Sequence, residues 1–325
     1  MEKPFVPSPG KPVIAVAGAT GGLGTRLTDT FLSPGLRDRL SGVVALARGH
    51  TPSTERWTKL DAEIRIIDDE CDENDLIMAL DGVDVLVNAI STVGASVRDQ
   101  LARALPKTSV KLYFPSEFGV DHTLHGFDIP EWDGKKRHYE LAKKVQVQQE
   151  ADFQMCRLFV GLFLHSGIGP WYGFHTSKGV YQAIGSLDQS SSYTDIGDIA
   201  RVVCGLAERA VRGEKVPEAL RIAGSHASCR QIAREMSAAG SGDIDLKTVE
   251  LDTYRDKALS RKYEDRGAIV YLRFLMGDGR VDYRPKDEGG LGNDNEVVNP
   301  WEQQFVWKTV RDLAHQSGGR PNSDV

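Results

Sequence analysis

One glycine-rich stretch near the start of the chain constrains the fold more than any other feature. The apolar run Val13–Ala17 leads into glycines spaced G-x-x-G-x-x-G, and Leu23, Leu27 and Phe31 then recur at helical spacing. We interpret this order as a strand, a tight turn and the start of a helix. Glycines let the backbone of such a turn approach a pyrophosphate, and the free N–H groups of the first helical turn face the anion. The alternative is a glycine-rich turn that binds nothing. The residues expected to contact a dinucleotide are Gly18, Thr20, Gly21, Gly22, Leu23 and Gly24.

Strand and helix patterns alternate after this turn. A helix is marked by Val97, Leu101 and Leu105, and short connections join it to its neighbours. Alternation of this kind favours a parallel sheet that helices cover on both faces. The runs that predict the further strands of this sheet are residues 43–47, 64–67, 83–91, 110–114 and 155–160, the last continuing to 165.

We therefore predict an α/β fold, a Rossmann-type doubly wound parallel sheet with a smaller C-terminal substrate-capping domain. Residues 1–160 are expected to form the NAD(P)-binding domain, and segments near 194–224 are expected to return to it. Residues 161–325 are expected to form mainly the substrate-binding region.

The strand ends indicate which dinucleotide is bound. Arg48 follows the second predicted strand, where an NAD-specific site usually carries an acidic residue. An arginine there can pair with a 2′-phosphate, which favours NADPH, whereas the alternative is a solvated side chain. Carboxyl ends of parallel strands line the ligand crevice, so we expect Asp68 near the adenine. The other expected cofactor contacts, unless they only cap strand ends, are Asn88, Ala89, Ile90, Ser91, Phe114, Pro115 and Ser116.

A predicted helix over residues 135–150 carries the candidates for catalysis. Tyr139 and Lys143 are four residues apart and share one face of that helix, and Lys144 is adjacent. A lysine near a nicotinamide ribose can orient the cofactor, lower the pKa of a neighbouring phenol or transfer a proton itself. Ser116 could supply a hydroxyl to the same crevice. The alternative is an ordinary solvated helix, because four of the ten residues 135–144 are Lys or Arg.

Aromatic residues in the second half indicate a pocket for a flat substrate. Three of them crowd one short loop over residues 170–175, although they could equally cap the core. The residues expected to contact substrate are Phe118, Phe163, His165, Trp171, Tyr172 and Phe174.

Composition excludes several other classes of function. A formal charge of −6 leaves no basic surplus to neutralise nucleic-acid phosphates or an anionic membrane. Scattered histidines and widely spaced cysteines predict no metal site and reduced thiols. Residues 1–12 lack the apolar run of a signal peptide, and no run is long enough to span a bilayer, so we expect a cytoplasmic monomer or homodimer.

The motifs together resemble the isoflavone-reductase-like branch of the NmrA-like family, an atypical branch of the short-chain dehydrogenases. The resemblance rests on G-A-T-G-G-L-G at 18–24 and on F-P-S-E-F-G at 114–119. Residues 194–200 resemble the family's T-x-x-D-I-(G/A) helix start. Residues 295–300, with Trp301 and Trp307, resemble the C-terminal segment of its fungal members. The likeness extends from about residue 11 to 321.

This resemblance implies an NADPH-dependent reductase of small aromatic or phenylpropanoid-like molecules or of a fungal secondary metabolite. It also implies a catalytic lysine on the helix after P-S-E-F-G, for which Lys143 is the first choice and Lys144 the second. Tyr139 and Lys143 form Y-x-x-x-K, as in ordinary short-chain dehydrogenases, but this branch generally lacks that tyrosine.

Two other functions remain open at this point. The NmrA-like family includes redox sensors that bind NADP(H) and a protein partner without catalysis, but such sensors tend to lack the lysine helix. An epimerase or dehydratase with tightly held NAD is the third possibility, and Arg48 argues against it.

Overall fold

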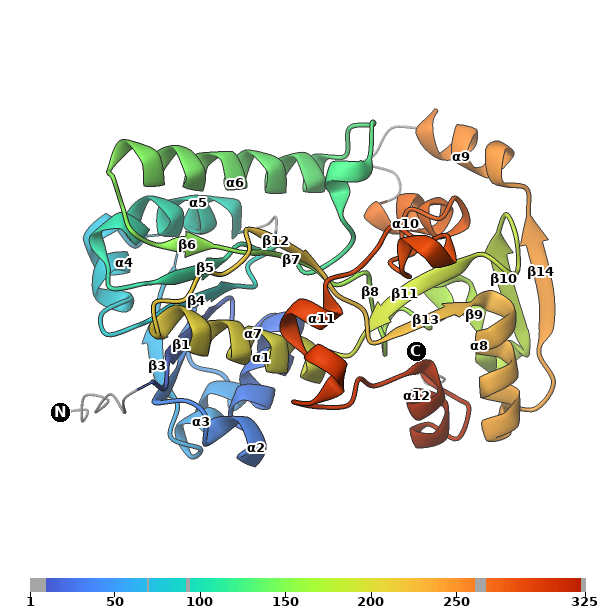
Figure 1. The fold of residues 1–325 in the computed structure, drawn as a ribbon, viewed down its shortest axis with the longest axis horizontal. Helices are drawn as coiled ribbons and strands as arrows, with labels where there is room; N and C mark the ends of the chain where they lie inside the picture. The colour runs from blue at the N-terminus through green and yellow to red at the C-terminus, as the bar shows by residue number, and fades with distance from the viewer. Residues whose placement is uncertain (1–9, 69, 92–93, 261–266, 323–325) are drawn as a thin grey trace. The chain divides into compact units, whose positions relative to one another are not determined.

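The computed structural model describes residues 10–68, 70–91, 94–260 and 267–322 (Figure 1). Residues 1–9 of the predicted N-terminal tail lie outside the described residues. The chain divides into two compact units. Unit 1 contains residues 1–117, 131–157 and 199–220, and unit 2 contains residues 118–130, 158–198 and 221–325.

Unit 1 is built on a parallel six-stranded sheet with the order β3-β2-β1-β4-β5-β6. The chain starts this sheet in the middle and adds strands outward on both sides, which is the doubly wound arrangement. This confirms the predicted fold class. The strands are β1 (Val13–Ala17), β2 (Gly42–Ala47), β3 (Glu63–Ile66), β4 (Val85–Asn88), β5 (Leu112–Phe114) and β6 (Gln154–Met155).

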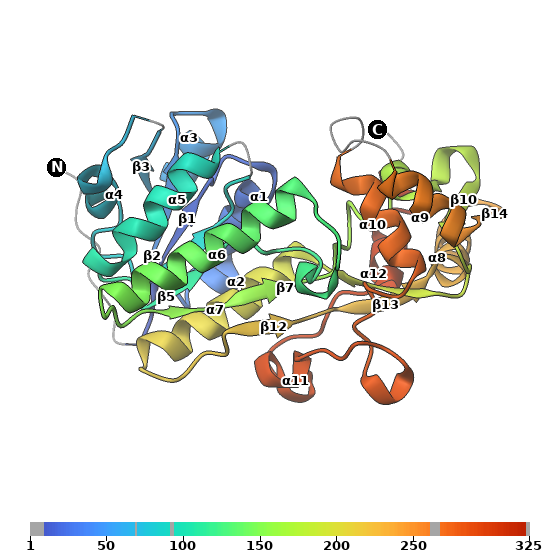
Figure 2. The same cartoon turned by 90° about the horizontal axis from the view of Figure 1, so that it is seen from above.

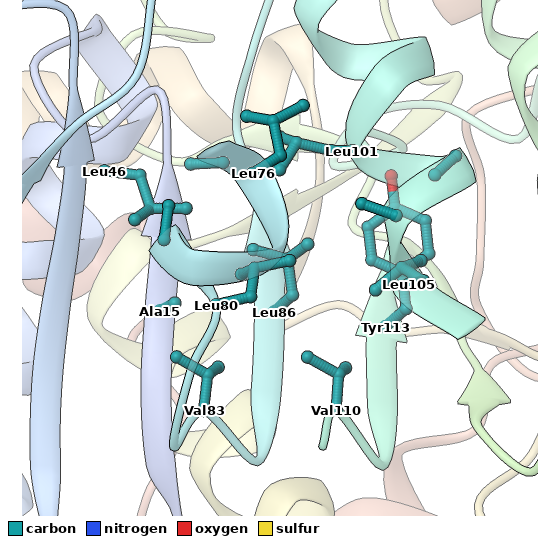
Figure 3. Packing of buried hydrophobic residues seen from close by; sticks show 14 of the residues in the cluster. Ala15, Leu46, Leu76, Leu80, Val83, Leu86, Leu101, Leu105, Val110 and Tyr113 are labelled. Atoms are coloured by element: carbon teal, nitrogen blue, oxygen red, sulfur yellow. The ribbon is translucent and has the colours of Figure 1, made fainter. Parts of the chain in front are cut away.

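Alternate residues of these strands build the core beneath three helices, α4 (Glu73–Ala79), α5 (Ala95–Ala104) and α6 (Pro130–Gln148). Ala15 of β1 and Leu86 of β4 point to this face and pack with Leu76 and Leu101 of the helices (Figure 3). Tyr113 of β5 is the bulky member of the cluster, with its hydroxyl at the end of an otherwise apolar side chain. Side chains alternate along a strand, so the neighbours of these residues face the opposite side.

The opposite face of the sheet is covered by α1 (Gly22–Phe31) and α7 (Ile196–Val211), and Figures 1 and 2 show α5 and α6 on the other side. Leu27 and Phe31 of α1 are fully buried, as their four-residue spacing predicts. Two short helices, α2 (Pro34–Arg37) and α3 (Pro52–Thr58), connect neighbouring strands.

The prediction of one strand over residues 155–165 is wrong. The segment forms three short strands in three different sheets: β6, β7 (Arg157–Phe159) and β8 (Leu162–Phe163). Gly161 ends the continuous path because it has φ +65° and because a Cβ there would lie 2.5 Å from the Ser192 carbonyl oxygen. β7 pairs with β12 (Ala219–Arg221).

Unit 2 contains two three-stranded sheets, β14-β10-β9 and β13-β11-β8. Ser228 caps the first helix after β13 through a reciprocal capping box with Gln231. The strands are β9 (Phe174–His175), β10 (Val180–Ile184), β11 (Ser190–Thr194), β13 (Ser225–Ser228) and β14 (Asp245–Val249). The helices are α8 (Cys229–Met236), α9 (Leu251–Leu259), α10 (Ala268–Gly277), α11 (Asn295–Val298) and α12 (Val310–Gln316).

Candidate dinucleotide site

The glycine turn between β1 and α1 leaves no space for side chains at two of its positions. Gly18 has φ +74°, and a Cβ on it would lie 3.0 Å from the Ile90 nitrogen. A Cβ on Gly24 would lie 2.1 Å from the Gly18 carbonyl oxygen. Glycine is therefore required at both positions, the first for the turn and the second for close packing of helix on strand.

The start of α1 has the features of an anion cradle. Gly21 precedes the helix without any side-chain cap, and no acidic residue occupies the first turn. A Cβ at Gly22 would meet no atom within 4 Å, so this side of the turn is open. The first N–H groups of a helix have no partner within it, and they favour a negatively charged ligand. The turn therefore fits the pyrophosphate of a dinucleotide.

Arg48 lies beside this turn. β2 pairs with β1 so that Leu46 is opposite Ala17, and the Leu46 carbonyl accepts a hydrogen bond from the Ala19 N–H at 3.2 Å. Arg48 follows two residues later with an exposed side chain. Within the described ranges its guanidinium has no hydrogen-bond or ion-pair partner, so it is free to bind a phosphate.

The ends of β4 and β5 lie along the same edge of the sheet. Ala89 N–H donates to the Ala17 carbonyl at 2.8 Å, which holds the segment after β4 against the glycine turn. Val87 of β4 is opposite Phe114 of β5. Phe114 and Pro115 are buried, Asn88 is fully buried, and Ser116 is half-buried. Ala89 and Ile90 are half-buried and Ser91 is exposed.

Asp68 has different surroundings from the other predicted contacts. It follows β3, and its carboxylate accepts a hydrogen bond from the Glu70 N–H at 2.9 Å. It also lines a surface hollow of about 630 Å³ that includes Glu63 and Arg65 but no residue of the glycine turn. Most charged groups around this hollow are carboxylates, which makes the hollow itself unsuited to a phosphate.

The candidates on α6 share one carboxylate. The Tyr139 hydroxyl donates to Glu218, and the Lys143 ammonium forms an ion pair with the same side chain. Burial, followed by the hydrogen bond to Glu218, raises the pKa of Tyr139. The Arg157 guanidinium lies 4.1 Å from the centre of the Tyr139 ring. Tyr139 is buried and Lys144 is exposed.

The structure joins Tyr139 to Lys143 but does not join either to Ser116. Among the described residues no hydrogen bond or ion pair links Ser116 with Tyr139, Lys143 or Lys144. A catalytic role of Lys143 would therefore require its ammonium to leave Glu218.

Sequence reasoning missed Lys135, which lies in the early turns of α6. Burial lowers the pKa of Lys135, and the nearby carboxylate of Glu117 opposes this shift. Glu117 is buried and directly follows Ser116 at the end of β5. The helix begins at Pro130, five residues before its predicted start, so Lys135 is inside the helix and not at its edge. Proline at the start of a helix was the signal that could have located it.

The predicted substrate contacts lie in unit 2 and differ in exposure. Trp171 is 71% exposed and His165 is exposed, whereas Phe118 and Phe174 are buried and Phe163 is half-buried. Tyr172 and Phe174 together line a small pocket of about 30 Å³. That volume holds a single water molecule and not an aromatic ring. Burial raises the pKa of the Tyr172 hydroxyl.

No group of three or more His, Cys, Asp or Glu residues in the described part of the chain could hold a metal ion. No helix in the described ranges combines the length and apolar character needed to cross a bilayer. Cys71, Cys156, Cys204 and Cys229 are free thiols.

The sequence is similar to those of known proteins. A sequence model described as the NmrA-like family matches residues 10–279. "Oxidoreductase aprR" of Aspergillus flavus is 27% identical over 170 residues, which are 51% of this chain and 53% of aprR, so the match spans about half the length of that relative.

Two solved structures have the same fold over most of their length. AtPrR2 with NADP+ and (+)pinoresinol superposes with a TM-score of 0.70 at 15% identity, over 94% of this chain and 98% of the other. Isoflavone reductase superposes with a TM-score of 0.70 at 14% identity, over 94% of this chain and 99% of the other.

Proposed function

The chain belongs to the NmrA-like family, and on this premise we propose that it is an NADPH-dependent reductase of a small aromatic or phenylpropanoid-like substrate. The observation that carries the proposal is the unpartnered Arg48 guanidinium beside an uncapped glycine turn. The turn supplies N–H groups for the pyrophosphate, and Arg48 supplies a cation for the 2′-phosphate. Two relatives agree with it in name: aprR is called an oxidoreductase, and AtPrR2 binds NADP+ with (+)pinoresinol.

The reduction requires a hydride and a proton. NADPH held by the glycine turn and Arg48 would supply the hydride for an electron-poor carbon of the substrate and would be oxidised to NADP+. Residues of this chain supply the proton to the oxygen on which negative charge develops, so that one NADPH and one proton are consumed for each substrate reduced. Contacts with the remainder of the substrate provide binding energy that fixes the geometry of transfer.

Two lysines of α6 are the candidate proton donors. Lys143 was the first choice from the sequence, but its charge is engaged by Glu218. Lys135 has a lowered pKa, and it interacts electrostatically with the buried carboxylate of Glu117, the residue after Ser116. A lysine with a lowered pKa releases its proton more readily near neutral pH. These properties support Lys135 as the donor and Lys143 as a positioning residue held by Glu218.

The first experiment titrates the purified protein with NADPH and NADH and follows tryptophan fluorescence. We expect NADPH to bind at least tenfold more tightly, which corresponds to about 1.4 kcal/mol. Arg48→Ala should abolish this preference, whereas Arg103→Ala, which removes an exposed arginine from α5, should keep it. Equal binding of both cofactors by the wild type would contradict the assignment of Arg48.

The second experiment tests the donor by single-turnover oxidation of NADPH with aromatic enones and benzylic ethers. Lys135→Ala should slow turnover roughly a hundredfold while the affinity for NADPH stays within a few-fold, because general acid catalysis contributes on the order of 10²–10⁴. Arg137→Ala removes an exposed basic side chain from the same helix and serves as the control. Full activity of Lys135→Ala, Lys143→Ala and Lys144→Ala would refute a lysine donor.

A sensor of the NADP+/NADPH ratio is the second candidate. The engagement of Tyr139 and Lys143 by Glu218 favours it, because a non-catalytic protein needs no free proton donor. Equally tight binding of NADP+ and NADPH, with no turnover across the substrate panel, would select the sensor.

A further inference from the structure

A chain of hydrogen bonds crosses unit 1 from the end of β4 to α5. Ile90 N–H donates to Asn88 Oδ1 at 3.0 Å, and Asn88 Nδ2 donates to the Tyr113 hydroxyl at 2.8 Å. The same hydroxyl lies 2.6 Å from His138 Nε2, and His138 Nδ1 lies 2.7 Å from Asp99 Oδ1. The side chains of Asn88, Tyr113 and His138 are buried, whereas that of Asp99 is 42% exposed.

One direction gives every donor of this hydrogen-bond chain an acceptor. Ile90 N–H can only donate, so the Asn88 carboxamide turns its oxygen toward Ile90 and its NH₂ group toward Tyr113. The Tyr113 hydroxyl accepts that bond and gives its own proton to His138 Nε2. The imidazole Nδ1 then carries a proton and donates it to the Asp99 carboxylate. All donors therefore point the same way, which strengthens each bond.

The charged groups around the chain keep its outer end anionic. Arg98 Nε lies 3.6 Å from Asp99 Oδ1, and the hydrogen bond from His138 lowers the pKa of Asp99. Glu117, which follows β5, acts electrostatically on the Tyr113 hydroxyl and on Lys135 of α6. A carboxylate at Asp99 accepts hydrogen bonds and does not compete as a donor, so it preserves the direction described above.

The Asn88 end of the hydrogen-bond chain holds the backbone segment that contacts the glycine turn. The Ile90 nitrogen would be only 3.0 Å from a Cβ on Gly18, and Ala89 N–H is bonded to the Ala17 carbonyl. Loss of the Asn88 oxygen would free the Ile90 peptide at the point where it lines the turn. Ile90 is half-buried, and an N–H shielded from water is costly without a partner, so the peptide would rotate to find one.

We propose that Asn88, Tyr113 and His138 are positioning residues that hold the Ala89–Ile90 backbone in the orientation required for NADPH to bind at the glycine turn. The identity of the ligand rests on the proposed function. The positioning itself is a property of the protein without ligand.

The test compares variants that break the chain with one that preserves its direction. Tyr113→Phe removes the central hydroxyl, and His138→Met removes both ring nitrogens. His138→Gln is the matched rescue, because its carboxamide can accept from Tyr113 and donate to Asp99. Tyr283→Phe is the control, since Tyr283 is fully buried and its hydroxyl accepts a hydrogen bond from Asp121 N–H at 2.8 Å in unit 2.

Two measurements are made on each full-length variant, far below its melting temperature. NADPH affinity should weaken by at least about fivefold in Tyr113→Phe and His138→Met, and by no more in the double variant than in either single one. Hydrogen exchange of a peptide containing Ile90, measured without cofactor, should accelerate in the same variants. His138→Gln and Tyr283→Phe should match the wild type in both measurements.

The outcomes separate this inference from the proposed function. Normal exchange and normal affinity in Tyr113→Phe and His138→Met, with only a lower melting temperature, would overturn the positioning role. A different result would be faster exchange at Ile90 in Tyr113→Phe and His138→Met than in the wild type, together with no NADPH binding by any of the three proteins. That result would support the positioning role while refuting the cofactor assignment.

Discussion

Gly24 and Gly22 are two residues apart in the same helical turn, yet replacement by alanine should change stability in opposite directions. At Gly24 the new Cβ would lie 2.1 Å from the Gly18 oxygen, 2.8 Å from the Gly18 carbon and 2.9 Å from the Ala19 Cα. All three are backbone atoms, so no side chain can rotate away. Ordinary contact begins near 3.4 Å, and the Gly18 carbonyl would have to retreat by more than 1 Å.

Moving the Gly18 carbonyl destabilises the protein by more than the higher helix propensity of alanine stabilises it. The Gly18 carbonyl accepts the Gly21 N–H at 2.9 Å, and loss of this bond costs about 1 kcal/mol. Overpacking adds about 1–3 kcal/mol, whereas alanine in a helix returns up to about 1 kcal/mol. We therefore expect Gly24→Ala to lower the free energy of unfolding by about 2 kcal/mol. Gly22→Ala meets no atom within 4 Å and should raise it by about 0.5–1 kcal/mol.

Urea denaturation followed by tryptophan fluorescence measures the difference, because Trp57 is fully buried in unit 1. NADPH titration of the same variants adds a second measurement. Affinity should fall in Gly24→Ala because the turn is distorted, and in Gly22→Ala because a methyl group enters the open side of the turn. A Gly24→Ala variant as stable as Gly22→Ala would refute the close approach of α1 to the Gly18 carbonyl.

Two further predictions concern carboxylates. The pKa of Glu218 lies below the ordinary 4.5, chiefly because of its hydrogen bond from Lys143 and then of that from Tyr139. A carboxyl group whose pKa is lowered in the folded state contributes stability above its unfolded pKa, and this contribution is lost as the pH falls. In urea denaturation, Glu218→Gln should therefore lose less stability than the wild type below about pH 4.5. Equal acid sensitivity of the two proteins would contradict this. Asp121 is buried and accepts from Arg221 Nε at 2.8 Å. Asp121→Asn should cost about 1–3 kcal/mol, which is less than for a fully buried pair because Arg221 reaches solvent. An unchanged urea midpoint would show that this pair contributes little.

The part of the site that could be predicted from the sequence is the part that local patterns encode. A run of five buried strand residues, three spaced glycines and a helical repeat specify β1, the turn and α1 without reference to the rest of the chain. Arg48 could be placed beside the turn because strand pairing in a doubly wound sheet follows from the connections.

The surroundings of the α6 side chains could not be predicted. Glu218 is 79 residues from Tyr139 along the chain, and no periodicity links them. His138 resembles any polar residue of a solvated helix, yet it is buried because Tyr113 and Asp99 satisfy both of its ring nitrogens. Long-range pairing of polar groups decides such positions, and single-sequence patterns contain no information about it.

The division of the chain into units has a consequence for how this protein can be divided by experiment or by evolution. The path crosses between the units five times, at residues 117/118, 130/131, 157/158, 198/199 and 220/221. A fragment that ends near residue 160 would lack the whole of α7 and the Glu218 carboxylate that accepts from Tyr139. Neither unit is therefore a continuous segment that recombination could exchange by itself. A new substrate specificity would have to arise by point substitutions and loop changes within an intact chain.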